Sequence, residues 1–287
     1  MKFSVVIATK DRAPLLDGAL ASLRAQQGAP EYELVVVDNG SSDATPAVAR
    51  AHGAVYAFVA EPNRGKARNA GIARATGDAI LFVDDDVVTP PHFLAAHAQA
   101  HRDEIFPLAV SGPILNVPDA AHRPEPTAAN FSRAFFVTCN VSVRAASLRA
   151  VGGFDEDFDL YGWEDTELGA RLRAHGVRRF FAKAAYLWHI KPPTPESLED
   201  ALDKAIEKAR MAARFVRKMP TARIKLATGA YAFNLARARV LAPPLAQPFF
   251  AGLASSTRVP SALAQLARTA LLDSVYTEEL ERQLRGR

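Results

Sequence analysis

The sequence has few of the features that mark secreted or membrane-spanning proteins. Its single cysteine, Cys139, excludes an intrachain disulfide, which is typical of proteins in a reducing compartment. No apolar run approaches the roughly 20 residues that a membrane-spanning helix needs. The apolar segment at residues 1–8 is too short for a secretory signal or a span. We therefore expect a cytoplasmic protein.

Two phosphate-binding loops are also missing. A dinucleotide-dependent dehydrogenase needs Gly-x-Gly-x-x-Gly after its first strand. A nucleotidyltransferase on a similar sheet would carry a glycine-rich loop with a lysine at the same place. The sequence instead reads Thr9-Lys10-Asp11-Arg12 there, so both enzyme classes are disfavoured.

The composition is that of a globular chain whose charge is unevenly distributed. The 287 residues are 49% hydrophobic and 23% charged, which suits one large domain or one domain with an extension. The net charge is +4, but from Ile190 onward 16 Lys or Arg stand against 9 Asp or Glu. Most of this surplus lies between Lys204 and Arg239, and such a segment favours an anionic partner.

The first 90 residues alternate strand and helix patterns, which predicts an α/β fold with a mostly parallel sheet. The expected strands span residues 3–8, 32–37, 54–59 and 80–83, and the expected helices span 13–25, 44–52 and 65–75. Polar residues follow three of these strands, at residues 9–11, 38–40 and 84–86. Because ligands bind beyond the carboxyl ends of parallel strands, these three segments predict one crevice.

The remainder of the chain is less regular. We expect strands at 108–115, 134–144 and 180–189, and helices at 90–102, 145–151 and 168–176. After Pro192-Pro193 the pattern becomes helical, with breaks at Pro220 and at Pro243-Pro244.

Three consecutive carboxylates, Asp84-Asp85-Asp86, directly follow the apolar run at 79–83. Neighbouring carboxylates raise one another's pKa, and a bound divalent cation would remove that repulsion. Mg²⁺ and Mn²⁺ take carboxylate oxygens and often keep substrate phosphates in the same shell. The alternative is an acidic surface turn.

These motifs, in this order and spacing, resemble the family 2 glycosyltransferases over roughly residues 1–190. Their segments are Val5–Thr9, Val35–Asp43, Asn63–Gly71, Phe82–Asp86, Gly152–Glu156 and Gly162–Leu168. The last two are similar to the acceptor-side segment of the galactosyltransferase-like branch. The resemblance implies the GT-A fold, and transfer of a sugar from a nucleotide diphosphate with inversion. It also implies a nucleotide-sugar-binding half at 1–118 and an acceptor half at 119–190, followed by a helical basic extension at 191–287.

The resemblance also implies the donor-binding residues. They are Thr9, Asp11, Asp38, Arg68, Asp84, Asp85, Asn140 and Trp163. Asp38 would accept hydrogen bonds from the uracil or ribose, because a carboxylate is an acceptor only; alternatively it organises the Asn39-Gly40 turn. Trp163 would offer its face to a sugar ring. Asp43 is better explained as a helix cap, and Cys139 as a small buried residue.

The metal ligands implied by the resemblance are Asp86, Asp84 and His189, holding Mn²⁺ or Mg²⁺. The metal would stabilise the charge that grows on the leaving nucleoside diphosphate. His189 closes the last expected strand, where a histidine could instead be a packed core residue.

Inverting transfer needs a base that takes the proton of the incoming hydroxyl. Asp165 in Trp163-Glu164-Asp165 is our choice, with Glu164 as the alternative. Both acids could instead stabilise the first turn of a helix.

The expected function is therefore transfer of a sugar, with UDP-sugar favoured, to a saccharide or lipid-linked acceptor. Cell-surface polysaccharide or glycolipid synthesis is the expected setting, and no nucleic-acid partner is expected. The alternative is a sugar-nucleotide-binding scaffold without turnover. We expect residues 191–287 to shape the acceptor site and to make peripheral contact with the inner face of the plasma membrane; packing on the catalytic domain or a homodimer are the alternatives.

Overall fold

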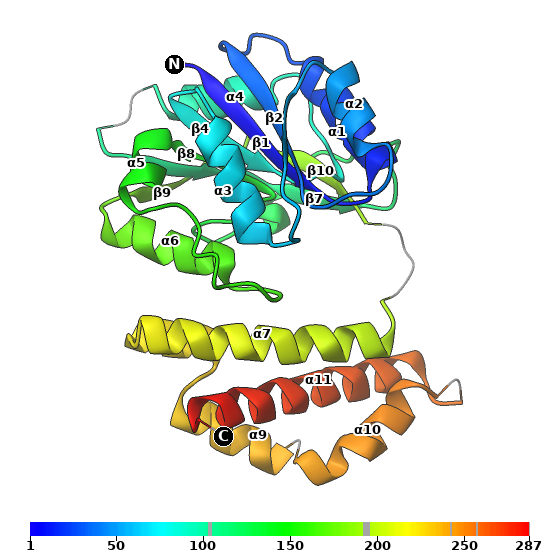
Figure 1. Cartoon of the computed structure of the whole chain (residues 1–287). Coiled ribbons are helices and arrows are strands. Elements are labelled where there is room, and N and C mark those ends of the chain that lie inside the picture. Colours follow the sequence, from blue (N-terminus) through cyan, green and yellow to red (C-terminus); the bar gives the residue numbers. More distant parts are fainter. Residues whose placement is uncertain (103–104, 192–195, 242, 257, 287) are drawn as a thin grey trace. The chain divides into compact units, whose positions relative to one another are not determined.

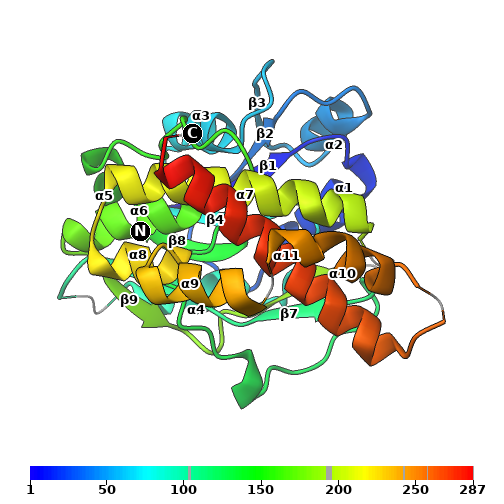
Figure 2. The same ribbon diagram turned by 90° about the horizontal axis from the view of Figure 1, so that it is seen from below.

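A computed structural model describes residues 1–102, 105–191, 196–241, 243–256 and 258–286; Pro192 and Pro193, where we expected the helical part to begin, lie outside them. The chain forms two compact units. The sheet unit comprises Met1–Asp159 and Glu164–Pro193, and the helical unit comprises Leu160–Trp163 and Thr194–Arg287. Figures 1 and 2 label most of the elements of both units.

A seven-stranded sheet organises the sheet unit, with the strand order β3-β2-β1-β4-β8-β6-β9. Strands β1 to β4 are parallel, whereas β8 runs antiparallel to β4 and β6. This mostly parallel sheet confirms the expected fold class. The strands are β1 (Phe3–Thr9), β2 (Tyr32–Asp38), β3 (Val55–Phe58), β4 (Ala79–Val83), β6 (Leu108–Ser111), β8 (Asn140–Arg144) and β9 (Arg178–Phe181).

Apolar side chains cover both faces of this sheet, which explains the continuous apolar runs of the central strands. Val5 and Ile7 of β1 pack with one hydrophobic cluster, and Val6 between them packs with the other. Helix α1 (Ala13–Arg24) contributes Leu16 and Leu20 to the first cluster, and α3 (Arg64–Arg74) contributes Ala67 to the second. The other helices of this unit are α2 (Thr45–Ala51), α4 (Phe93–Ala100), α5 (Ala145–Ala150) and α6 (Glu164–Ala174).

Two of the expected strands are each divided between two sheets. The second sheet is β5 (Val87–Val88), β10 (Leu187–Ile190) and β7 (Ile114–Val117). The strand expected at 108–115 therefore breaks at Gly112-Pro113, and that expected at 180–189 breaks between β9 and β10. Gly112 lies so close to another segment that a Cβ there would be 1.7 Å from the Ala185 carbonyl oxygen. This close approach joins two segments remote in sequence, and only glycine permits it.

Two further boundaries differ from the expectation. Residues 134–139 are not a strand, because the backbone N–H of Thr138 donates to the carboxylate of Asp165 instead of to a neighbouring strand. Helix α6 begins at Glu164 instead of at Leu168. Three acids in its first turn, Glu164, Asp165 and Glu167, favour this early start through the helix dipole.

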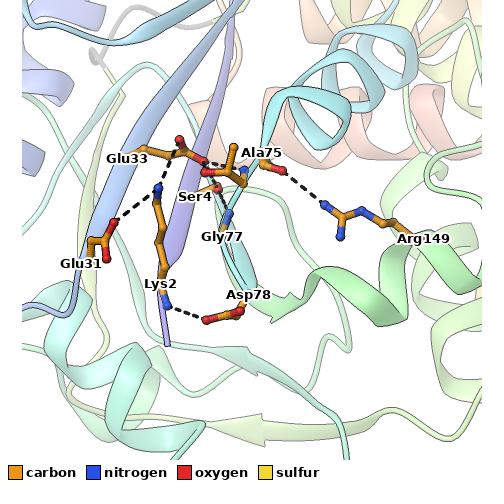
Figure 3. A network of polar contacts seen from close by, with 9 residues as sticks. Lys2, Ser4, Glu31, Glu33, Ala75, Gly77, Asp78 and Arg149 are labelled. Carbon is orange, nitrogen blue, oxygen red and sulfur yellow. Dashed lines mark hydrogen bonds and ion pairs between the residues drawn. The ribbon is translucent and has the colours of Figure 1, made fainter.

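A polar network ties the amino-terminal end of β1 to its neighbours (Figure 3). The carboxylate of Glu33 accepts hydrogen bonds from Ser4 Oγ at 2.5 Å and from the Thr76 N–H at 2.7 Å. Ser4 Oγ in turn accepts from the Gly77 N–H at 2.8 Å. Burial acts to raise the pKa of Glu33, but the hydrogen bonds together lower it by more than burial raises it. The pKa of Glu33 therefore stands below its usual value. The network fixes the turn before β4 at the amino-terminal ends of the strands. The polar segments at residues 9–11, 38–40 and 84–86 follow the opposite, carboxyl ends.

The helical unit is built from five α-helices within the described residues. They are α7 (Leu198–Lys218), α8 (Ala222–Thr228), α9 (Ala232–Leu241), α10 (Gln247–Ala254) and α11 (Ser261–Leu284). Helices α7 and α11 pack together, and Arg210 of α7 donates to Glu279 of α11 at 2.8 Å. Helix α7 ends two residues before Pro220, as the sequence predicts. In the described part of the chain, no helix combines the length and apolarity needed to cross a bilayer.

Candidate functional site

The carboxyl ends of β1, β2 and β4 bring three polar segments together, as the sequence predicts. Thr9 pairs in register with Asp38, and β4 continues into the acidic triplet. Thr9 Oγ1 donates to Asp85 at 2.6 Å, and Arg12 Nη1 lies 3.1 Å from oxygens of both Asp85 and Asp86. Asp85 is buried, and burial raises its pKa. It therefore anchors β4 to β1 and orients its two acidic neighbours.

The outer two acids of the triplet meet His189, which β10 supplies. His189 Nε2 lies 3.0 Å from Asp86 Oδ1, and its Nδ1 lies 3.1 Å from Asn116 Oδ1. Potential ligand atoms of Asp84, Cys139 and His189 all lie within 4.8 Å of one another. Carboxylate and imidazole donors in this arrangement fit a divalent cation such as Mn²⁺. Asn116 would fix the imidazole orientation from outside the metal shell.

The protonation of these groups follows from their surroundings. Burial raises the pKa of Asp84. Burial also acts to raise that of Asp86, but the hydrogen bond with His189 and the charge of Arg12 bring it below its usual value. The pKa of the Cys139 thiol stands well above its usual value because the side chain is buried and faces Asp84 and Asp86. The thiol therefore stays protonated at neutral pH unless a cation binds beside it.

Asp38 is fully buried at the end of β2, and both of its carboxylate oxygens are engaged. One accepts the Ser41 N–H at 2.7 Å, and the other accepts the Tyr56 hydroxyl at 2.8 Å. Burial and this hydrogen bond raise the pKa of Tyr56 to about 12. Asp38 therefore organises the turn after β2, and only its remaining lone pairs could accept from a ligand.

Asp11 and Asp43 join the loops that follow β1 and β2. Asp11 has a left-handed backbone, with φ of 51°, and its carboxylate accepts from the Ser42 N–H at 2.7 Å. Asp43 accepts from the N–H groups of Ala13 and Thr45, the first residues of α1 and α2. It thus caps two helices at once, in agreement with the expected capping role.

Arg68 projects from α3 toward two carboxylates in the first turn of α6, Glu164 and Asp165. Its Nη1 lies 3.1 Å from Glu164 Oε1 and 3.5 Å from Asp165 Oδ1, and 12% of its side chain is exposed. Its guanidinium also lies 5.5 Å from the Phe154 ring centroid. Burial would lower the pKa of Arg68, but Asp165, Glu164 and Asp84 raise it above its usual value. The guanidinium is therefore a permanent cation in the cluster.

Asp165 is held through one oxygen only. Its Oδ2 accepts from both the N–H and the hydroxyl of Thr138, at 3.0 and 2.9 Å. Its Oδ1 is buried, and no hydrogen bond reaches it from the described residues, although Arg68 lies within ion-pair distance. Glu164 differs, because it is buried against Arg68 and its pKa is raised by burial and by Asp165. Of the two acids, Asp165 has a carboxylate oriented through Oδ2, with an Oδ1 that no hydrogen bond from the described residues reaches.

The acidic triplet is electrostatically coupled to the cluster of Arg68, Glu164 and Asp165. Besides burial, the groups that act on the pKa of Asp84 include Arg68, Asp165 and His189. Asp84 therefore lies within the electrostatic reach of both His189, in the possible metal-binding group, and the carboxylate of Asp165.

Two predicted donor residues have their polar groups engaged elsewhere. Asn140 is buried in β8, and its amide nitrogen donates to the carbonyls of Ala185 and Pro113 at 2.8 and 3.3 Å. Its Oδ1 pairs with His97 Nε2 at 2.9 Å. Trp163 belongs to the helical unit, and its Nε1 donates to the carbonyl oxygen of Lys208 in α7 at 3.0 Å.

Sequence reasoning missed the roles of Arg12 and Thr138. The sequence showed Arg12 only as one of the polar residues that follow β1. Its neighbours in the sequence do not indicate that it reaches Asp85 and Asp86. Thr138 is 27 residues from Asp165, so its contact has no sequence signal. The roles of both residues depend on tertiary packing.

Comparison with known proteins finds two family models that match the chain. The model described as glycosyl transferase family 2 matches residues 4–147, and that described as the N-terminal domain of galactosyltransferase matches residues 124–192. Validoxylamine A glucosyltransferase of Streptomyces hygroscopicus subsp. limoneus is 34% identical over 262 residues, covering 76% of this chain and 57% of that protein. Chondroitin synthase of Escherichia coli is 25% identical over 248 residues, covering 69% of this chain and 36% of that protein. The chain thus spans little more than half the length of the first of these relatives.

Two solved structures resemble the chain over nearly its whole length. The mannosyltransferase PcManGT from Pyrobaculum calidifontis, in complex with GDP-Man and Mn²⁺, has a TM-score of 0.61 at 19% identity, covering 98% of this chain and 86% of that one. S. aureus TarS 1-349, in complex with UDP-GlcNAc, has a TM-score of 0.54 at 20% identity, covering 100% and 93%. At these identities the likeness concerns the fold.

Proposed function

Since the chain belongs to glycosyl transferase family 2 and has the GT-A fold, we propose that it is an inverting, metal-dependent glycosyltransferase. It transfers a sugar from a nucleotide-diphosphate donor, with UDP-sugar favoured, to a hydroxyl of a saccharide or lipid-linked acceptor. Cell-surface polysaccharide or glycolipid synthesis is the proposed setting. A PcManGT complex with GDP-Man and Mn²⁺ and a TarS complex with UDP-GlcNAc support a nucleotide-sugar donor.

One observation carries the proposal: Asp84, a member of the possible metal-binding group, lies close enough to Asp165 and Arg68 for their charges to act on its pKa. Asp86, Asp84 and His189 would hold Mn²⁺ or Mg²⁺, and the bound ion would stabilise the charge on the departing nucleoside diphosphate. Arg12 and Asp85 hold the triplet in place from β1 and the loop after it.

Asp165 takes the proton from the incoming acceptor hydroxyl. Thr138 fixes Oδ2, so that Oδ1 accepts the proton while the hydroxyl oxygen attacks the anomeric carbon. The nearby Arg68 guanidinium offsets the repulsion between the adjacent carboxylates of Glu164 and Asp165. Glu164 remains the alternative base, but its direct pairing with Arg68 leaves it less available.

A donor screen by calorimetry tests this function. UDP-, GDP- and dTDP-sugars are titrated with Mn²⁺ present and then with EDTA, and transfer is measured in parallel. The expected results are metal-dependent binding of UDP-sugars and loss of binding in Asp86→Ala. Undiminished turnover in EDTA would contradict the metal role.

The base is tested separately with Asp165→Asn, which should lose transfer and keep donor binding. The matched control is Asp159→Asn, at an exposed acid of the sheet unit, which should behave like the parent. Full activity in Asp165→Asn would remove Asp165 from its role. Donor binding by the parent without any turnover would instead support the scaffold alternative.

We further propose that the helical unit makes peripheral contact with an anionic membrane. Its exposed apolar side chains include Leu226, Phe233 and Phe249, at 67%, 74% and 66% exposure. Leu226 and Phe233 lie within the basic segment between Lys204 and Arg239. Sedimentation with vesicles that contain phosphatidylserine should pull down the parent at low salt and not the Phe233→Ser, Phe249→Ser variant. If vesicles bind neither protein while the parent is dimeric in solution, these side chains form a homodimer contact instead.

A further inference from the structure

Four polar side chains at the centre of the sheet unit form one hydrogen-bonded series, which we call the buried histidine chain. Its members are His101, Ser142, His97 and Asn140, and none is more than 1% exposed. Both His101 Nε2 and His97 Nδ1 lie 2.9 Å from Ser142 Oγ, and His97 Nε2 lies 2.9 Å from Asn140 Oδ1. Polar groups that are removed from water need such partners, and a satisfied network makes its surroundings rigid.

Two backbone carbonyls at one end of this chain fix the positions of its protons. The Asn140 amide nitrogen donates to the carbonyl oxygens of Ala185 and Pro113, at 2.8 and 3.3 Å. Because a carbonyl oxygen only accepts, Asn140 presents its Oδ1 to His97, and His97 Nε2 must carry the proton. Burial lowers the pKa of His97 to about 3, so its ring is neutral at pH 7 and its Nδ1 accepts from the Ser142 hydroxyl. The hydroxyl oxygen in turn accepts the Nε2–H of the second histidine.

Asn140 connects three strands around the acidic triplet. Its backbone lies opposite Val83, the last residue of β4, in the antiparallel register of β4 and β8. Its side chain reaches the start of the second sheet, since Pro113 directly precedes β7 and Ala185 lies two residues ahead of β10. The carbonyl oxygen of Pro113 also accepts the Leu187 N–H at 3.1 Å. One amide group therefore ties the end of β4 to the starts of both β7 and β10.

The starts of these two strands determine where His189 stands. Strands β7 and β10 are parallel, and Asn116 is paired in register with His189. His189 Nδ1 lies 3.1 Å from Asn116 Oδ1, and His189 Nε2 lies 3.0 Å from Asp86 Oδ1. Asn116 and His189 follow the two carbonyls that Asn140 binds by three and four residues. A strand displaced at its start would therefore move the imidazole relative to the acids.

We propose that the buried histidine chain is a positioning device: His97 orients the Asn140 amide, which holds β10 so that His189 faces Asp84 and Asp86. This inference rests on the metal site of the proposed function. It makes His97 a determinant of divalent-cation affinity, although its own hydrogen bonds go to other residues. It also gives Asn140 a positioning role in place of the expected donor contact.

The proton positions are tested by long-range ¹H–¹⁵N NMR on the metal-free full chain, which needs no destabilised protein. His97→Gln and His101→Gln serve only to assign the signals. At pH 7, the parent should show His97 as a neutral ring with its proton on Nε2, and His101 with a proton on Nε2. A His97 ring that carries its proton on Nδ1, or on both nitrogens, would overturn the inference.

Two substitutions of His97 separate positioning from stability. In His97→Gln the side-chain amide reaches about as far as Nε2 and can still donate to Asn140, whereas in His97→Asn it reaches only about as far as Nδ1. Both variants should have a lower urea midpoint, because each leaves a buried polar partner unsatisfied. Only His97→Asn should weaken Mn²⁺ binding, by about tenfold. The measurement is the EPR signal of free Mn²⁺, with Mn²⁺ alone and with Mn²⁺ and UDP.

The matched control is Ser4→Ala, which removes a buried hydroxyl at the opposite end of the sheet. It should lower the urea midpoint as well and leave Mn²⁺ affinity within about twofold of the parent. Equal losses of Mn²⁺ affinity in His97→Asn and Ser4→Ala, or in His97→Asn and His97→Gln, would show a general effect of stability and would overturn the inference.

Amide exchange of the metal-free protein gives a readout that does not depend on the cation. In His97→Asn, exchange at residues 187–190 should rise about fivefold relative to exchange in β2, which corresponds to the loss of about one net hydrogen bond. His97→Gln and Ser4→Ala should show no such selective rise. Unchanged exchange at 187–190 in His97→Asn, or an equal rise in β2, would contradict the positioning of β10.

Failure of the proposed function gives a different result. If the parent binds no Mn²⁺ and EDTA leaves transfer undiminished, the metal role is removed. A selective rise in exchange at 187–190 in His97→Asn would then still support the positioning of β10 by His97. Without that rise, the inference itself is removed.

Discussion

Replacing Arg68 by methionine should destabilise the protein by an amount that grows with pH. The guanidinium lies 3.1 Å from Glu164 and 3.5 Å from Asp165, and the side chains of Arg68 and Glu164 are 12% and 9% exposed. At an effective dielectric constant of about 20, each pair is worth about 5 kcal/mol of Coulomb energy, most of which offsets desolvation. Removing one partner of such a buried pair typically costs about 3–5 kcal/mol, because the remaining charges are buried without compensation.

The pH dependence follows from the carboxylates that remain. The pKa of Glu164 is already raised by burial and by Asp165, and Arg68 opposes that rise. In Arg68→Met the pKa of Glu164 therefore climbs further above its unfolded value. A carboxyl group with a raised pKa stabilises the fold at low pH, and this contribution is lost as pH rises through the folded pKa. The deficit relative to the parent should be smaller at pH 5 than at pH 8.

Urea unfolding at both pH values measures these differences. The double variant Arg68→Met, Glu164→Gln should recover part of the lost free energy at pH 8, because it removes one of the two buried charges. The control is Arg74→Met, on an exposed position in the last turn of α3, for which a change under about 1 kcal/mol is expected. A deficit of less than 1 kcal/mol in Arg68→Met, equal at the two pH values, would refute the role of Arg68 as the compensating cation.

Three further substitutions test the fold and the site. In Gly71→Ala, the new Cβ would lie 2.4 Å from a valine Cγ1 of β1, so urea unfolding should show a loss of about 1–3 kcal/mol, whereas Gly18→Ala, with nothing within 4 Å, should show none. Thr138→Val keeps the N–H but removes the hydroxyl bond to Asp165, so kcat should fall about 10- to 100-fold with calorimetric donor binding unchanged; an unaltered kcat would contradict the orienting role. Burial lowers the pKa of His97 to about 3 in the folded protein, so on acidification the unfolded chain takes up a proton on this histidine before the folded protein does. The free energy of unfolding should therefore fall below about pH 6.5, by up to about 1.4 kcal/mol per pH unit. In His97→Gln, urea unfolding at pH 7.5 and 5.5 should show a smaller fall, and equal slopes would exclude this linkage.

The central strands and crossover helices were predictable because their signals are local. Each buried strand has a continuous apolar run, and the polar residues that follow it mark where the strand ends. Asn63, whose side chain caps α3 through the Lys66 N–H, and the proline that starts α1 mark helix beginnings within a few residues. Such signals depend on the chain's own neighbours, so one sequence suffices to find them.

The breaks at Gly112 and before Leu187 were not predictable, because they follow from an approach of Gly112 to Ala185. A glycine and a proline in an apolar stretch indicate a possible break, but only the packed structure shows which backbone arrives there. The same limit applies to Arg68. We expected Arg68 among the donor-binding residues, and its contacts with carboxylates 96 and 97 residues away along the chain have no local sequence signal.

In the candidate site, too, some residues could be predicted from the sequence and others could not. The acidic triplet and Asp165 were identifiable, since consecutive acids after a strand and acids at a helix start are visible in the sequence. The residues that hold these carboxylates in place were not identifiable. Thr138 and Arg12 reach their carboxylates only after the strands have assembled, and no periodicity or composition records that.

The short pairing of β10 with β5 limits where insertions or deletions can be tolerated in the chain. His189 stands opposite Val87, and the Ile190 N–H donates to the Asp86 carbonyl oxygen at 2.8 Å. Side chains alternate between faces along a strand, so inserting or deleting one residue just ahead of Leu187 would present a neighbour of His189 to the acids. Variation in length is therefore expected to accumulate in the exposed stretch near Asp119, where loop growth leaves that pairing untouched.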